Sequence, residues 1–293
     1  MVVRGAVCVV VTALALTSAC SGGSTNETSE SPAPSPSSAA PTSEVPLTGR
    51  YVAIGDSYSA GPGIPIIDPE SDLCLRSQSN FPSLLAAKVS TNLVDVSCSG
   101  ATTQTATAGT PGVNGPIPPQ LDALDAETDL VTVQLGGNDG GLFQTLLQAC
   151  SNSASTCEQY VDSQAPSVLA RTTDRVVTLL AEVESRAPAA EIVLVGYLRL
   201  SPVSGTCDEL GVGEDAQDSV REAEVGLNDA LAAAAQRAGV TFVSMLAASE
   251  GHDACAGEDA WTNGATASNG DGIIFHPRPA GIEAVATAVA TAL

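Results

Sequence analysis

The chain has 293 residues with 33 acidic and 11 basic side chains, which gives a formal net charge of −22. Because phosphate groups are bound by basic surfaces, this balance argues against a nucleic-acid partner and against electrostatic docking on anionic lipids. Hydrophobic residues make up 44% of the chain and aromatic residues only 3%, so a full core is expected to consist mostly of Ala, Val and Leu.

The N-terminal segment, residues 1–19, has the pattern of a signal peptide. The uncharged apolar run that follows Arg4 is too short to span a bilayer, and the small residues before Cys20 suit cleavage. Residues 16–23 resemble a bacterial lipobox, in which Cys20 is lipidated, although Thr17 stands where the pattern prefers Leu, Val or Ile. A lipid-anchored protein and a plainly secreted one are therefore both open, and each is extracytoplasmic.

Residues 20–46 are rich in Ser, Pro and Thr, with almost nothing to bury, which predicts a disordered tether. The remaining residues, 47–293, suit one α/β domain. An even number of cysteines in an exported domain predicts three disulfides, and a zinc site is disfavoured because no C-x-x-C pair is present. The cysteines of the domain are Cys74, Cys98, Cys150, Cys157, Cys207 and Cys255.

Apolar runs that end at turn residues alternate with helical patterns along the domain. Strands are expected at residues 51–54, 92–96, 129–135, 191–198 and 240–246, and helices at 83–89, 121–126, 142–150, 159–186, 219–238 and 280–293. Pro166 marks the start of the longest helix or a kink in it, and a small polar loop is expected between Cys150 and Cys157. The stretches 101–120 and 249–275 are expected to be irregular. This alternation predicts a parallel sheet covered by helices on both faces.

Three of the predicted strands end in short polar turns, and the first of these turns carries Ser57. That strand breaks into Gly55-Asp56-Ser57, the second is followed by Gly100, and the third is followed by Asn138. Because the carboxyl ends of parallel strands meet at one edge of a sheet, these turns are expected to lie close together. Ser57 can then be a nucleophile, with its own N–H, the Gly100 N–H and the Asn138 amide as oxyanion donors. The alternative is that Asp56 and Ser57 only cap the next helix.

The general base that a nucleophilic serine needs must be one of the two histidines, His252 or His276. His276 lies just ahead of the last helix, from where a loop can fold back over the strand ends. His252 lies close to Cys255, which is expected to be disulfide-bonded. Position therefore favours His276, although either histidine can be structural.

These blocks resemble, in the same order, the four motifs of the SGNH or GDSL hydrolases. They are Gly55-Asp56-Ser57-Tyr58-Ser59, Gly100, Gly136-Gly137-Asn138-Asp139 and His276-Pro277, and together they span nearly the whole domain. The resemblance implies a three-layer α/β/α flavodoxin-like fold around a mostly five-stranded parallel sheet. It also implies Ser57 as nucleophile, His276 as base, and an oxyanion hole made of Ser57, Gly100 and Asn138.

The secreted actinobacterial lipases and esterases of that family also have six cysteines in the domain. In that subgroup the cysteines pair in sequence order, which implies the disulfides Cys74–Cys98, Cys150–Cys157 and Cys207–Cys255. The region around His252 and Trp261 is similar to the same subgroup, which makes His252 structural or pocket-lining.

One position departs from the pattern of the family. Many members have Asp three residues before the histidine, where this chain has Ile273. Asp271 is the only acid nearby, so either Asp271 or a backbone carbonyl near Ile273 is expected to orient the His276 ring. Asp56 is expected to brace its own turn and not to serve as the missing acid.

The sequence thus predicts an exported serine esterase or lipase that cleaves acyl esters through an acyl-Ser57 intermediate, with no metal or cofactor. The 101–120 loop and the segment around Trp261 are expected to shape its acyl pocket. Two alternatives stay open: a carbohydrate O-deacetylase of cell-envelope glycans, and a surface binding protein without useful catalysis. The expected partner is a small acyl-ester or lipid substrate. The protein is expected to be a monomer that is attached to a membrane only through a lipid on Cys20.

Overall fold

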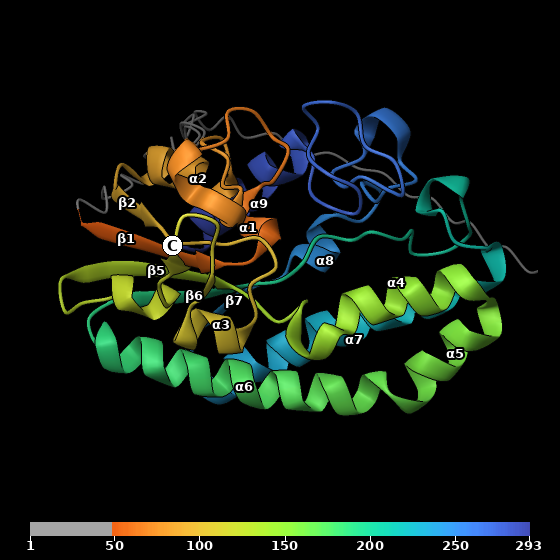
Figure 1. The fold of residues 1–293 in the computed structure, drawn as a ribbon, viewed down its shortest axis with the longest axis horizontal. Coiled ribbons are helices and arrows are strands. Elements are labelled where there is room, and N and C mark those ends of the chain that lie inside the picture. Colours follow the sequence, from red (N-terminus) through yellow and green to blue (C-terminus); the bar gives the residue numbers. More distant parts are fainter. Residues whose placement is uncertain (1–48) are drawn as a thin grey trace, which may run out of the picture. The chain divides into compact units, whose positions relative to one another are not determined.

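The structure is a computed structural model that describes residues 49–293, so the expected signal peptide and tether lie outside the described part of the chain. A five-stranded parallel sheet forms the centre of the domain, with the strand order β2-β1-β5-β6-β7 (Figure 1). The strands are β1 Arg50–Gly55, β2 Asn92–Asp95, β5 Thr128–Gln134, β6 Glu191–Val195 and β7 Thr241–Val243. This is the flavodoxin-like order, and the predicted α/β fold is confirmed.

Strand β1 lies between β2 and β5 and is buried along its length except at Arg50. Tyr51, Val52 and Ala53 have no exposed surface, because side chains on both faces of a parallel sheet point into a layer of helices. The strand order reverses at β1, so a crevice opens where β1 and β5 end. In open α/β sheets this is the place where ligands bind. The polar turns after β1 and β5 therefore start from the same edge of the sheet.

Helices cover both faces of this sheet (Figure 1). Helices α2 and α9 pack together on one face, and α6 and α7 pack together on the other. On α6 the buried residues include Val168, Thr172, Val176 and Val183, which recur at the spacing that places side chains on one helical face. The helices are α1 Ser57–Ala60, α2 Phe81–Val89, α3 Thr103–Ala108, α4 Leu142–Asn152, α5 Ala154–Ser163, α6 Ala165–Arg186, α7 Glu214–Ala238, α8 Met245–Ala248 and α9 Pro279–Ala292.

The prediction of an irregular loop over residues 101–120 is wrong in part. This stretch forms helix α3 and a short antiparallel hairpin, β3 Thr110–Pro111 with β4 Pro116–Ile117. Helix α3 begins with a capping box in which the Thr102 hydroxyl accepts the Thr105 N–H and the Thr105 hydroxyl accepts the Thr102 N–H. Threonine is more favourable at helix caps and turns than in helix interiors, so the many threonines of this stretch indicated a loop. Here two of them form the cap that stabilises α3.

Several predicted boundaries also differ from the structure. The helix expected at residues 121–126 is a 3₁₀ turn, Gln120–Ala123, and β7 is followed at once by α8. The long pattern at 159–186 is split at Gln164, with Pro166 in the first turn of α6, as the proline indicated. Instead of a loop between Cys150 and Cys157, the last turn of α4 and the first turn of α5 meet at Ser153, whose hydroxyl caps α5.

Three disulfides hold the chain segments outside the sheet. The pairs are Cys74–Cys98, Cys150–Cys157 and Cys207–Cys255, which is the pairing that the family resemblance implied. Within residues 49–293 no helix combines the length and the apolar character needed to cross a bilayer.

Candidate active site

Ser57 stands at the first position of α1, directly after strand β1 ends. The Asp56 carboxylate accepts the Tyr58 N–H at 2.9 Å, so Asp56 caps the helix, and the capping interpretation holds for this residue. Gly61 closes the helix after one turn in the left-handed conformation, with φ 68°. Ser57 itself is not used as a cap, and its hydroxyl stays available for another partner.

That partner is His276, which the loop before α9 carries back over the strand ends. The Ser57 Oγ and His276 Nε2 atoms are 2.7 Å apart, and His276 Nδ1 lies 2.7 Å from the carbonyl oxygen of Ile274. A carbonyl can only accept, so Nδ1 carries the ring hydrogen and Nε2 of the neutral ring accepts from the serine. Burial lowers the pKa of His276 below its ordinary value, which favours this neutral form, although the bond to Ile274 opposes the shift.

The loop in front of His276 is fixed by two buried side chains. Asn263 Nδ2 donates to the carbonyls of Asp271 and Ile273, at 2.7 and 3.2 Å. Tyr58 Oη donates to the carbonyl of Phe275 at 2.8 Å, and Phe275 has a left-handed φ of 59°, which a non-glycine residue adopts only when its surroundings hold it. The Ile274 carbonyl is therefore presented to the imidazole by a rigid support.

Asp271 and His252, the remaining candidates for a third triad member and for a base, are bonded to other groups. Asp271 pairs with Arg278 at 3.4 Å, whereas the His276 ring is bonded to a backbone carbonyl. His252 is stacked on Trp261 with ring centroids 4.1 Å apart, and its Nδ1 is bonded to the carbonyl of Asp259. His252 therefore supports the 249–262 segment and has no bond to Ser57.

Gly100 and Asn138 lie on the turns that follow β2 and β5. Asn138 Nδ2 donates to the carbonyl of Ala101 at 3.0 Å, which ties the Asn138 side chain to the residue after Gly100. Gly100 has φ 77°, and a Cβ on it would meet nothing within 4 Å, so its backbone faces open space. Within residues 49–293, neither the Ser57 N–H nor the Gly100 N–H donates a hydrogen bond to another protein atom. Both are free to bind a substrate oxygen.

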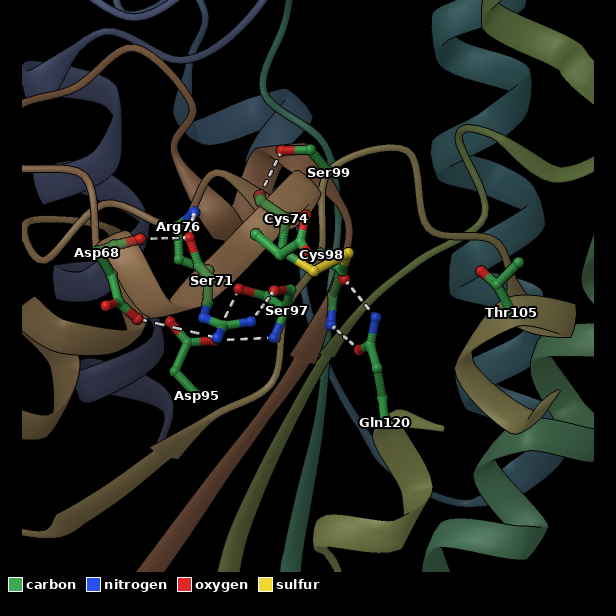
Figure 2. The surroundings of a disulfide bond; sticks show 12 residues. Asp68, Ser71, Cys74, Arg76, Asp95, Ser97, Cys98, Ser99, Thr105 and Gln120 are labelled. Carbon is green, nitrogen blue, oxygen red and sulfur yellow. Dashed lines mark hydrogen bonds and ion pairs between the residues drawn. A yellow bond between two sulfur atoms is a disulfide. The ribbon is translucent and has the colours of Figure 1, made fainter. Parts of the chain in front are cut away.

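Several bonds on one side of the site fix the Gly100 turn (Figure 2). The Cys74–Cys98 disulfide holds it covalently, and both the N–H and the hydroxyl of Ser99 donate to the carbonyl of Cys74. Gln120 Oε1 accepts the Gly55 N–H at 2.8 Å, and Gln120 Nε2 donates to the Gly55 carbonyl at 3.0 Å. The side chain thus makes the two bonds that the backbone of a neighbouring strand would make. The Cys98 N–H donates to the carbonyl of Gly55 at 2.9 Å, so the turn after β2 is also bonded to the end of β1.

An apolar pocket opens beside Ser57, Asn138 and His276. It encloses about 620 Å³ of empty space, part of it open to solvent. Its walls come mainly from α4 and α7, with Leu142, Phe143, Leu146, Ala223 and Leu227 among the lining residues. The 101–120 stretch and Trp261 do not line this pocket, and the 101–120 stretch lines a second pocket together with Gly100. The helical pattern of α4 and α7 could have indicated these residues only if the packing of the two helices were known.

Sequence patterns also failed to predict three buried polar residues around the site. Tyr197 and Asn263 each stand alone in the sequence, far from the residues that they contact, so no local motif marks them. Glu224 lines the pocket and caps the turn at Leu200 and Ser201, and burial raises the pKa of its carboxyl to about 7. In the described part of the chain no group of three His, Cys, Asp or Glu side chains is arranged to hold a metal ion.

Known proteins are similar to this chain in both sequence and fold. The model of the GDSL-like lipase/acylhydrolase family matches residues 53–284. Lipase 2 of Streptomyces coelicolor is 38% identical over 229 residues, which cover 74% of this chain and 76% of that protein. Two solved structures cover 84% of this chain and 100% of their own, each with a TM-score of 0.69. They are phospholipase A1 of Streptomyces albidoflavus, at 29% identity, and an extracellular lipase of Streptomyces rimosus, at 27%.

Proposed function

The chain belongs to the GDSL-like lipase/acylhydrolase family and is a carboxylic ester hydrolase, and on that premise we propose that it is an exported serine lipase or esterase with Ser57 as nucleophile and His276 as general base. The observation that carries this proposal is the 2.7 Å contact between Ser57 Oγ and His276 Nε2, in a ring whose other nitrogen is already bonded.

In the first step Ser57 Oγ attacks the carbonyl carbon of the ester while its proton passes to His276 Nε2. The carbonyl π electrons move to the oxygen, and the tetrahedral intermediate then expels the alcohol, which takes the proton from His276. A water molecule then gives a proton to His276 Nε2 and attacks the acyl carbon. The second tetrahedral intermediate breaks its bond to Ser57 Oγ, which takes the proton back from His276, and the carboxylic acid is released. The Ile274 carbonyl takes the orienting role of a third triad member, because it holds Nδ1–H in one tautomer throughout.

The developing oxyanion would be bound by the free N–H groups of Ser57 and Gly100 and by the Asn138 amide. All three groups lie at the same edge of the sheet, and Asn138 is already tied to the Gly100 turn through Ala101. Each such donor stabilises a transition state by about 3 kcal/mol.

The apolar pocket supports an acyl chain as the part of the substrate that enters the protein. Its lining by leucine and phenylalanine side chains offers contacts that an acetyl group of a glycan does not need. The relatives named as lipases and the structure named as a phospholipase A1 agree with an acyl-ester or lipid substrate. Export is supported by the three disulfides and by the extracellular relative, and all proposed site residues come from one chain, as in a monomer.

A panel of p-nitrophenyl esters from acetyl to palmitoyl tests the proposal. We expect turnover by the domain, strongest above acetyl, and a loss of kcat of about 10³-fold or more in Ser57→Ala and His276→Ala. His252→Ala is the matched control and should keep its turnover, because His252 has no bond to Ser57. Equal turnover by Ser57→Ala and the unmodified domain, or no turnover by either, would contradict the assignment.

A further inference from the structure

Tyr197 lies two residues beyond the end of β6 and joins the turns that follow β1 and β5. Its hydroxyl accepts the Gly137 N–H at 2.9 Å and donates to the Asp56 carboxylate at 2.5 Å. A peptide N–H can only donate and an ionised carboxylate can only accept, so in this form the phenol O–H donates to Asp56. Burial raises the pKa of the Asp56 carboxyl to about 7. One phenol oxygen thus links the residue before Ser57 to the residue before Asn138.

Neighbouring groups hold Tyr197 in this position. Its backbone N–H donates to Asn228 Oδ1 of helix α7 at 2.9 Å. Its ring lies edge-to-face on Tyr58, with centroids 5.0 Å apart, and packs so closely on Gly137 that a Cβ there would lie 3.1 Å from the ring. The side chain is 6% exposed, so water does not replace the bonds that its hydroxyl makes.

This link connects the turn of the proposed nucleophile with the turn of a proposed oxyanion donor. Ser57 must stand at a fixed distance from the Asn138 amide, because the serine attacks the carbonyl carbon while the amide binds the carbonyl oxygen. The two residues lie on the turns that follow β1 and β5. The last backbone bond between these strands runs from the Asp56 N–H to the Gln134 carbonyl, at 3.0 Å, so it holds the start of the Ser57 turn but does not reach the Asn138 turn. A displacement of about 1 Å between such groups lowers a rate by about 100-fold.

We propose that Tyr197 is a positioning residue, whose hydroxyl sets the Ser57 turn and the Asn138 turn in the geometry that the transition state requires. The inference rests on the proposed function, since it assumes Ser57 as nucleophile. It assigns Tyr197 no contact with the reacting atoms. Tyr197 acts through Asp56 and Gly137.

The test compares Tyr197→Phe with Tyr51→Phe. The phenylalanine at 197 keeps the ring and its packing but removes both hydrogen bonds. Tyr51 is a matched control, because it is a buried tyrosine like Tyr197 and its hydroxyl is bonded to Thr132, 2.7 Å away within the sheet. We expect Tyr197→Phe to lower kcat about tenfold to 100-fold with KM changed less than about twofold, whereas Tyr51→Phe keeps its kcat. Circular dichroism and urea unfolding check that both variants are folded.

A double-mutant cycle with Asp56→Ala tests the route of the effect. If Tyr197 acts through Asp56, adding Tyr197→Phe to Asp56→Ala lowers kcat by less than about twofold further. Equal kcat values for Tyr197→Phe and Tyr51→Phe would overturn the inference. So would a raised KM at unchanged kcat, which would mean that Tyr197, one of the residues that line the pocket, acts only on substrate binding, or fully additive losses in the cycle. Failure of the proposed function looks different, since the unmodified domain would then be inactive and Ser57 would not react with a phosphonate ester probe.

Discussion

The His276 ring is held by a backbone carbonyl where many serine hydrolases use a carboxylate. A carbonyl fixes the tautomer as a carboxylate does, but it brings no negative charge to stabilise the imidazolium that forms during the reaction. Burial acts in the same direction, and it lowers the pKa of His276 in the free protein. The proposed base is therefore neutral at neutral pH, with no carboxylate bonded to its ring to raise its pKa.

This arrangement predicts the acid side of the pH profile. Protonated His276 cannot accept the Ser57 proton, so activity is lost as the pH falls through the pKa of His276 and is full above it. We expect kcat/KM for p-nitrophenyl butyrate to rise to a plateau with an apparent pKa below 6.5, the ordinary value for histidine. Asp271→Asn should leave this profile in place and cost less than about tenfold in rate, about 1.4 kcal/mol. A larger loss would return Asp271 to the triad.

The residues of the site differ in how far the sequence could predict them. Ser57, Gly100 and Asn138 follow strands whose apolar pattern is clear, so their common edge could be derived from the alternation of elements and named from the family motifs. Tyr197 and Asn263 could not be predicted, because an isolated polar residue carries no pattern until the fold supplies its partner. Ile274 contributes only its carbonyl, which no side-chain motif encodes.

At the scale of elements, helix α3 is the main difference between prediction and structure, and it is anchored to the site. Asp139, which follows Asn138, is fully buried and accepts the N–H of Thr103 at 2.9 Å and its hydroxyl at 2.5 Å. The start of α3 is therefore fixed to the turn after β5, and the Gly100 turn lies just ahead of it. Asp139 belongs to a motif that the sequence displays, but its partner lies on a helix that the sequence obscured.

Removing the hydroxyl of Thr103 should loosen this anchor. In Thr103→Val the buried carboxylate of Asp139 loses one donor, and we expect the free energy of unfolding to fall by about 1–3 kcal/mol. We also expect a lower kcat, because the Gly100 turn is no longer fixed. Thr107→Val is the control on the same helix, since that hydroxyl bonds only to the carbonyl of Gln104. Urea unfolding and ester turnover measure both effects, and equal stability of the two variants would contradict the anchor.

At the scale of the whole molecule, the strand order accounts for the place of the chemistry. The alternation of strands and helices predicted a parallel sheet, and the order β2-β1-β5-β6-β7 places the switch point at β1, the strand that leads into Ser57. The walls of the pocket could not be predicted in the same way. They depend on how α4 and α7 pack, which is a long-range property of the fold.

The attachment of the molecule remains a proposal from its sequence, since Cys20 lies outside the described residues. We propose that Cys20 carries the lipid that holds the domain at the cell surface. Metabolic labelling with a palmitate analogue should mark the full chain and disappear in Cys20→Ala, with the protein recovered from the medium. Ser21→Ala controls for a change at the neighbouring position, and labelling that persists in Cys20→Ala would refute the anchor.

The Cys74–Cys98 disulfide gives the maturation of this protein an order in time. Cys98 lies two residues before Gly100, and disulfides form in oxidising compartments, so the proposed export would add the covalent support of the Gly100 turn only once the chain has left the reducing cell interior (Figure 2). A newly made chain with both thiols reduced lacks that support, and we expect it to be a poor catalyst. With export as proposed, we expect the cell that makes the protein to be spared hydrolysis of its own esters until the chain has left it.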